Sequence, residues 1–307
     1  MNNKKDGNNA LEIQNGPNSV SRRELLKAAG MSAIAATTGL NKDAFAGASE
    51  NQASALLKGN IKHSVCRWCY DKISIENLAE NCVRIGIKSI ELVDPNDWPV
   101  LKKYGLICAM VGSHGITKGL NRSENHVQCL DAISKSIEAA AEAGFPNVIC
   151  FSGNRDGMPD DEGLKNCAEG IKQVVGLAEK KGVTICMELL NSKWNHKDYM
   201  CDHTEWGVLL CKRVGSPRLK LLYDIYHMQI MEGDIIKTIR DNIDYIGHFH
   251  TGGVPGRNEI DETQELCYPA IIRAIAETKF DGYIAQEFVP RRDPLKSLEQ
   301  AIHICDV

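Results

Sequence analysis

Residues 162–189, EGLKNCAEGIKQVVGLAEKKGVTICMEL, contain the pattern that decides the fold. Over Glu162–Lys181 the apolar residues recur at helical spacing, which predicts an amphipathic helix. A short joint with a glycine, Lys180-Lys181-Gly182, leads into the apolar β-type run Gly182–Leu189. A longer polar loop, Asn191–Asp202, follows. Helix, short joint, buried strand and long loop form one unit.

The same alternation covers the chain from residue 61 onward. The runs predicted to be strands are Ile61–Arg67, Lys88–Val93, Leu106–Ser113, Asn147–Ser152, Gly182–Leu189, Leu219–Ile225, Ile243–His250 and Gly282–Phe288. The predicted helices are Ile73–Ile85, Glu124–Ala143, Glu162–Lys181, Thr204–Val214, Asp234–Asn242, Tyr268–Thr278 and Pro294–Cys305. Apolar strands that alternate with helices indicate a parallel sheet covered by helices.

Eight strands over roughly 240 residues match an α/β (β/α)8 TIM barrel, whose usual length is about 250 residues. The alternative is an open doubly wound sheet, which typically has a glycine-rich phosphate turn after its first strand. The first strand ends here in Cys66-Arg67-Trp68-Cys69, without glycine. We therefore predict a TIM barrel catalytic domain over residues 61–307.

The longer loops follow the strands: Gly112–Asn121, Gly153–Asp161, Asn191–Asp202 and Thr251–Cys267. Barrel enzymes build their active sites from this end of the strands. Four consecutive predicted strands finish there on a carboxylate or an imidazole. The four residues are Glu188, Asp224, His250 and Glu287, separated by 36, 26 and 37 positions. Chemistry is expected at this end of the barrel.

Three carboxylates that converge at a barrel mouth repel one another, and each is costly to desolvate. A divalent cation removes both problems. Three oxygen donors and one nitrogen suit Mn²⁺, Mg²⁺ or a similar ion such as Co²⁺ or Zn²⁺. The alternative is four unrelated polar residues with local partners. We favour one divalent metal site.

Two motifs carry a resemblance to a known family. Residues 223–229, YDIYHMQ, and residues 248–259, HFHTGGVPGRNE, resemble hydroxypyruvate isomerases and, more widely, the xylose isomerase-like barrel superfamily, which also holds ketose 3-epimerases. The resemblance covers residues 61–305. It implies that Glu188, Asp224, His250 and Glu287 bind one divalent metal, and that Glu188 and Glu287 act as acid and base. Hydroxypyruvate isomerases tend to have Gln where this chain has His250, whereas the epimerases have His.

Four further residues are candidates for substrate binding. His227 lies three residues after Asp224 and could donate to a substrate oxygen, although a local partner would also explain it. Arg257 follows a Pro-Gly turn and could bind a carboxylate with two hydrogen bonds. Trp68 at the end of the first strand could form one wall of a sugar-binding pocket, and His114 could complete that pocket. We interpret His63, His126, His196, His203, His248 and His303 as structural or surface residues.

The favoured function is a metal-dependent isomerase that moves a proton between adjacent carbons through an enediolate, with hydroxypyruvate converted to 2-hydroxy-3-oxopropanoate. A ketose 3-epimerase or keto-inositol isomerase is the alternative. A metal-dependent nuclease would require a basic groove, and a carbohydrate-binding barrel would not require a pair of glutamates. The resemblance also permits a homo-oligomer.

Composition limits the partners and the compartment. The chain has 36 Lys and Arg against 40 Asp and Glu, a net charge of −4, which gives no general attraction to nucleic acid. No apolar run reaches the about 18 residues of a transmembrane helix. Most of the twelve cysteines lie in apolar stretches and are expected to be buried. Cys66 and Cys69 could form a redox or zinc pair.

The first 46 residues form a polar leader and a predicted export signal. Residues 21–27, SRRELLK, resemble the twin-arginine signal; a weakly apolar stretch follows, and Ala44-Phe45-Ala46 fits a cleavage site. We predict export to the periplasm, a linker at residues 47–60 and a mature chain from Gly47. Cleavage removes six Lys/Arg and four Asp/Glu, which leaves 30 basic and 36 acidic residues, a net charge of −6.

Overall fold

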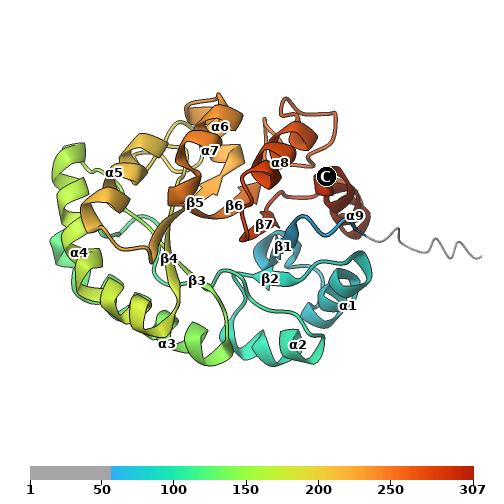
Figure 1. The fold of residues 1–307 in the computed structure, drawn as a ribbon, viewed down its shortest axis with the longest axis horizontal. Coiled ribbons are helices and arrows are strands. Elements are labelled where there is room, and N and C mark those ends of the chain that lie inside the picture. The colour runs from blue at the N-terminus through green and yellow to red at the C-terminus, as the bar shows by residue number, and fades with distance from the viewer. Residues whose placement is uncertain (1–56) are drawn as a thin grey trace, which may run out of the picture. The chain divides into compact units, whose positions relative to one another are not determined.

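The computed structural model describes residues 57–307, in which a curled parallel sheet is surrounded by helices (Figure 1). The predicted export signal at residues 1–46 and most of the predicted linker lie outside the described residues. None of the helices in residues 57–307 has the length and apolar character needed to cross a bilayer.

Within residues 57–307, seven strands form one sheet in the order β2-β1-β7-β6-β5-β4-β3, with every pair parallel. They are β1 (Lys62–Cys66), β2 (Ser89–Glu91), β3 (Asn147–Cys150), β4 (Thr184–Glu188), β5 (Leu219–Asp224), β6 (Ile246–Thr251) and β7 (Tyr283–Gln286). The prediction of a parallel α/β barrel is confirmed.

The third predicted strand, Leu106–Ser113, is not a continuous strand. It bridges the two edges of the sheet through single parallel pairs, Ile107 with Ser89 and Val111 with Val148. Between these pairs, side chains replace the usual backbone partners: the Ala109 N–H donates to Ser89 Oγ (2.8 Å), and Asn147 Nδ2 donates to the Ala109 carbonyl (2.9 Å). The segment therefore closes the barrel without forming a regular ladder.

The helices of the described residues are α1 (Ile75–Ile85), α2 (Trp98–Lys103), α3 (His126–Ala143), α4 (Asp160–Lys181), α5 (Thr204–Val214), α6 (Ile225–Met231), α7 (Ile235–Asn242), α8 (Tyr268–Glu277) and α9 (Pro294–Cys305). Each of the seven predicted helices is present. Two were not predicted: α2 has only six residues, and α6 follows β5 with no intervening loop.

The short joints between helices and strands depend on glycine. Gly144 and Gly182 follow α3 and α4 with φ of 77° and 72°, in the left-handed region that glycine adopts without strain. Their backbone N–H groups donate to carbonyls of the last helical turn. The chain can then turn at once into the next strand.

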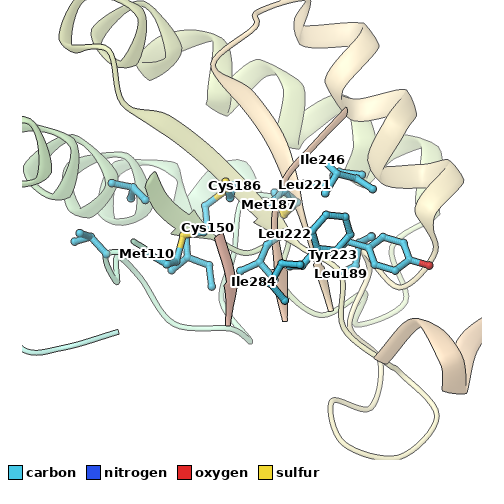
Figure 2. Packing of buried hydrophobic residues seen from close by; sticks show 14 of the residues in the cluster. Met110, Cys150, Cys186, Met187, Leu189, Leu221, Leu222, Tyr223, Ile246 and Ile284 are labelled. Carbon is cyan, nitrogen blue, oxygen red and sulfur yellow. The ribbon is translucent and has the colours of Figure 1, made fainter. Parts of the chain in front are cut away.

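The core lies on both faces of the strands. Side chains of β3, β4, β5, β6 and β7 pack together with Met110 of the bridging segment (Figure 2). Cys108, Cys150, Cys186 and Cys211 are buried in it, as predicted. All twelve cysteines are free thiols, so Cys66 and Cys69 form no disulfide with each other.

Candidate active site

Four buried side chains meet where β4, β5, β6 and β7 end. Glu188 and Asp224 are the last residues of β4 and β5, His250 lies in β6, and Glu287 directly follows β7. Ligand-type atoms of all four lie within 4.8 Å of one another. The parallel register explains this arrangement, because it pairs Asp224 with His250 and His250 with Ala285 on neighbouring strands.

The carboxylates differ in their tendency to ionise. Burial raises the pKa of Asp224 to about 7, although Arg257 opposes the rise. Burial also raises the pKa of Glu188, and His250 opposes it. For Glu287, burial alone would raise the pKa, but Arg257 and His250 outweigh it and hold the pKa well below its usual range. Positive charge therefore decides which carboxylates stay ionised.

Arg257 supplies part of that charge. Its Nη2 donates to Asp224 Oδ2 (2.8 Å) and to Glu287 Oε2, and its Nε donates to the Glu287 carbonyl (3.0 Å). The guanidinium also lies 5.5 Å from the Trp68 ring centroid and 5.2 Å from that of Tyr226. Arg257 has a φ of 57°, which is uncommon for a residue other than glycine. The surrounding contacts hold it there.

His227 in α6 is fully buried beside Asp224, whose carboxylate caps the helix by accepting from the His227 N–H (3.2 Å). Asn191 Nδ2 lies 2.6 Å from its Nδ1, and Arg257 Nη1 lies 2.9 Å from its Nε2. Burial and Arg257 hold the pKa of His227 well below its usual value, so the ring is neutral. A neutral imidazole has one lone pair and accepts from only one of these donors at a time.

A cavity of about 680 Å³ opens onto the cluster and contains Trp68, His114 and Arg257 among its lining residues. Trp68 is 44% exposed and its Nε1 donates to Glu287 Oε1 (2.8 Å). His114 lies in the wall, but both ring nitrogens contact backbone groups, those of Gly115 and Phe151. It shapes the cavity, with neither nitrogen left over for a ligand.

Several residues near the site were not predicted. His196, interpreted from the sequence as a structural or surface residue, lines the cavity and packs against the His227 ring, with 5.3 Å between centroids. Asn195 also lines the cavity. Glu91, the last residue of β2, is fully buried and contacts His250 and His248. The sequence signal for Glu91 was the same as for the others: a carboxylate that ends an apolar strand.

The donor set fits a divalent metal ion. Nδ1 of His250 lies 2.6 Å from Glu287 Oε2 and 3.4 Å from Glu188 Oε1, yet no described residue offers it a well-directed hydrogen bond. Burial lowers the pKa of His250, but Glu287 outweighs it and the pKa is raised well above its usual value. Positive charge is thus favoured at this point, and a metal ion among three carboxylates and one imidazole would provide it.

Comparisons with known proteins agree with the fold. The family model described as xylose isomerase-like TIM barrel matches residues 79–305. A 2-oxo-tetronate isomerase of Cupriavidus necator is 31% identical over 163 residues, which are 52% of this chain and 61% of the relative, so the match spans under two thirds of its length. Hydroxypyruvate isomerase of Escherichia coli is 23% identical over 69% of this chain and 86% of its own.

Two solved structures share the barrel. One is described as AP endonuclease, family 2, from Brucella melitensis, with a TM-score of 0.71 and 21% identity over 78% of this chain and 97% of the other. The other is D-psicose 3-epimerase with D-tagatose from Clostridium cellulolyticum, with a TM-score of 0.66 and 18% identity over 80% of this chain and 100% of the other. At these identities the likeness concerns the fold.

Proposed function

Because the chain belongs to the xylose isomerase-like TIM barrel family, we propose that it is a divalent-metal-dependent isomerase of a small hydroxy-carbonyl compound. The observation that carries the proposal is the buried cluster of Glu188, Asp224, His250 and Glu287, of which Glu188 and Glu287 line a cavity. When bound there, a divalent ion would act as a Lewis acid on the substrate oxygens.

In this proposal Glu188 and Glu287 transfer the proton. Both line the cavity, so both can reach a substrate held in it. One carboxylate removes the proton from the carbon beside the carbonyl and leaves an enediolate, and the carboxyl group so formed returns the proton to the neighbouring carbon. The hydroxyl proton moves from one substrate oxygen to the other in the same reaction. The Trp68 hydrogen bond to Glu287 Oε1 and the Arg257 contact to Oε2 fix the Glu287 carboxylate in one orientation.

Arg257 and His227 bind the substrate in the same proposal. The Arg257 guanidinium lies in the cavity wall, and its Nη1, which contacts His227 Nε2, can donate to a substrate carboxylate once that contact opens. His227 Nε2 can donate to a substrate oxygen once its contact with Arg257 opens. A 2-oxo acid such as hydroxypyruvate, converted to 2-hydroxy-3-oxopropanoate, uses both groups.

A second candidate function is favoured by the size and character of the cavity. At about 680 Å³ it has room for roughly twenty waters, much more than a three-carbon acid occupies. Its apolar wall is formed by Leu92, Ile116, Ile149, Phe151, Leu190 and Val289. The C–H face of a ketose or keto-inositol ring would contact such a wall. A ketose 3-epimerase or keto-inositol isomerase is therefore the second candidate.

Substitution of the two glutamates tests the proposal. Glu188→Gln and Glu287→Gln should each lower turnover by about 10²–10⁴-fold, because amides cannot accept the proton. Substrate binding should persist. Glu259→Gln is the control, since this buried carboxylate lies outside the cluster and bonds to Arg292 and Ser297. If both cluster variants keep full turnover, the role assigned to the glutamates is wrong. If the wild type binds sugars without turnover, the molecule is a binding protein.

We also propose that residues 1–46 direct export to the periplasm through the twin-arginine pathway, and that the enzyme binds its small-molecule substrate in that compartment. The order of features in residues 21–46 supports this proposal: the SRRELLK motif, a weakly apolar stretch and then Ala44-Phe45-Ala46. Export should stop in the Arg22→Lys/Arg23→Lys variant, as measured by fractionation of the host cell. A homo-oligomer stays a prediction.

A further inference from the structure

A buried acidic residue lies directly behind the four-residue cluster. Glu91, which ends β2, is 0% exposed, and its carboxylate has polar neighbours on both oxygens. Oε1 lies 2.7 Å from His250 Nε2 and 3.0 Å from His248 Nε2, and Oε2 accepts from Ser64 Oγ at 2.6 Å. The proposed function uses none of these contacts.

Strand geometry explains why the contacts form. His248 and His250 are two residues apart in β6, so both side chains lie on the same side of the strand. Ser64 and Cys66 have the same relation in β1, and the register pairs Cys66 with Glu91. The topology thus brings one carboxylate to both imidazoles.

The carboxylate determines which nitrogen of His250 is free. An ionised carboxylate only accepts hydrogen bonds, so the His250 Nε2 facing Glu91 carries a proton. When the ring is neutral, the lone pair is therefore on Nδ1. Nδ1 is the atom that lies among Glu188 and Glu287.

We propose that Glu91 is a positioning residue: it holds the His250 ring in the orientation and tautomer that present Nδ1 to the metal. The proposal rests on the proposed function. Carboxylates that bond to the far nitrogen of a metal-binding histidine fix the ring and raise its basicity. Glu91 contacts His250 directly and is not among the residues that line the cavity, so it would act through His250.

Two other interpretations must be distinguished. Cys66, Glu91 and His250 themselves place ligand-type atoms within 4.8 Å of one another, so a second ion could bind there. Alternatively, Glu91 could stabilise the barrel without affecting metal binding. The number of metal ions bound per chain tests the first interpretation. A double-mutant cycle of Glu91 and His250, with metal affinity as the readout, tests the second.

The experiment measures the Kd of Mn²⁺ for four proteins: wild type, Glu91→Gln, His250→Gln and the double variant. We expect one equivalent of metal in the wild type and a Kd about 10–100-fold higher in Glu91→Gln. In the His250→Gln background the second substitution should change Kd less than about twofold, because the residue through which Glu91 acts is gone.

The results that would contradict the positioning role differ from those that would contradict the proposed function. An equal loss in both backgrounds, or no loss in Glu91→Gln, overturns the positioning role while the proposed function stands. Two equivalents in the wild type, reduced to one by Cys66→Ser, also overturn it, because Glu91 would then be a ligand. A wild type that binds no divalent ion overturns the role and the metal dependence together.

A spectroscopic measurement covers the case in which Glu91→Gln fails to fold. In ¹⁵N-histidine-labelled wild type loaded with Zn²⁺, we expect His250 to keep its proton on Nε2 and the metal-induced shift to fall on Nδ1. A metal-induced shift on Nε2, or a proton on Nδ1, would overturn the proposal.

Discussion

Arg257 is the residue on which the electrostatics of the site depend. Without a cation, Glu188, Asp224 and Glu287 would bring three carboxylates together in a buried site. Arg257 contacts two of them directly, and its guanidinium is flanked by the rings of Trp68 and Tyr226. The same group is our candidate for binding a substrate carboxylate, so it links stability to function.

Arg257→Gln should destabilise the metal-free protein by about 3 kcal/mol, because removal of one partner leaves buried charge uncompensated. Mn²⁺ should restore most of the loss by neutralising the same carboxylates. Unfolding monitored by circular dichroism, with and without Mn²⁺, measures both effects. Arg292→Gln is the matched control, since Arg292 pairs with Glu259 and Asp261 but its side chain is half exposed. Equal losses in the two variants would contradict the role given to Arg257.

At the residue scale, the candidate site could be predicted because charged residues at the ends of parallel barrel strands come together at one end of the barrel. This argument identifies Glu188, Asp224, His250 and Glu287 as candidates. The roles assigned to them stay predictions. The rule applies equally to Glu91, which ends β2 and was not predicted. His196 and Asn195 could not be found in this way, because they lie in the irregular segment between β4 and α5. Their positions depend on the folded loop.

Element by element, local pattern accounts for most of the fold. The ends of α3 and α4 can be predicted locally, because Gly144 and Gly182 are the glycines that cap these helices. The segment Leu106–Ser113 has a strand pattern, but Ser89 and Asn147 side chains take up the hydrogen bonds of Ala109. No periodicity in the segment itself reveals those distant partners. Helix α6 was not predicted because β5 leads into it without a break.

Strand β1 contains a histidine that should make the protein sensitive to acid. His63 is 1% exposed, and neither ring nitrogen has a hydrogen-bond partner among the described residues. Burial lowers its pKa from 6.5 to about 4, although Asp306 opposes the change. The unfolded chain therefore takes up a proton at a higher pH than the folded chain does. Stability from this group is present above pH 6.5 and is lost as the pH falls toward 4.

His63→Leu should remove that part of the acid sensitivity. The free energy of unfolding of the wild type should fall by about 2 kcal/mol more than that of the variant between pH 7.5 and pH 5. Urea unfolding at the two pH values measures the difference, and the comparison at pH 7.5 controls for the change in packing. Parallel pH profiles for the two proteins would show that His63 does not titrate as its burial requires.

At the scale of the whole molecule, the fold and the site limit the chemistry more than they limit the substrate. The net charge of −4 and the family fit a small-molecule enzyme. Arg257 favours a 2-oxo acid, whereas the large cavity with its apolar wall favours a ketose. Both substrates have an acidic C–H beside a carbonyl, so both reactions would begin with the same proton abstraction by a glutamate. An isomerase then returns the proton to the neighbouring carbon, whereas a 3-epimerase returns it to the opposite face of the same carbon.

The most direct test of the central claim is proton exchange in D₂O by the purified protein, with its metal content measured on the same sample. Hydroxypyruvate and a panel of ketoses are the substrates, and Glu188→Gln is the control. The account predicts one equivalent of a divalent metal and deuterium beside the carbonyl of at least one substrate, with exchange abolished by chelation and in the control. A metal-free protein that catalyses no exchange would contradict the account, leaving a barrel that binds without catalysis.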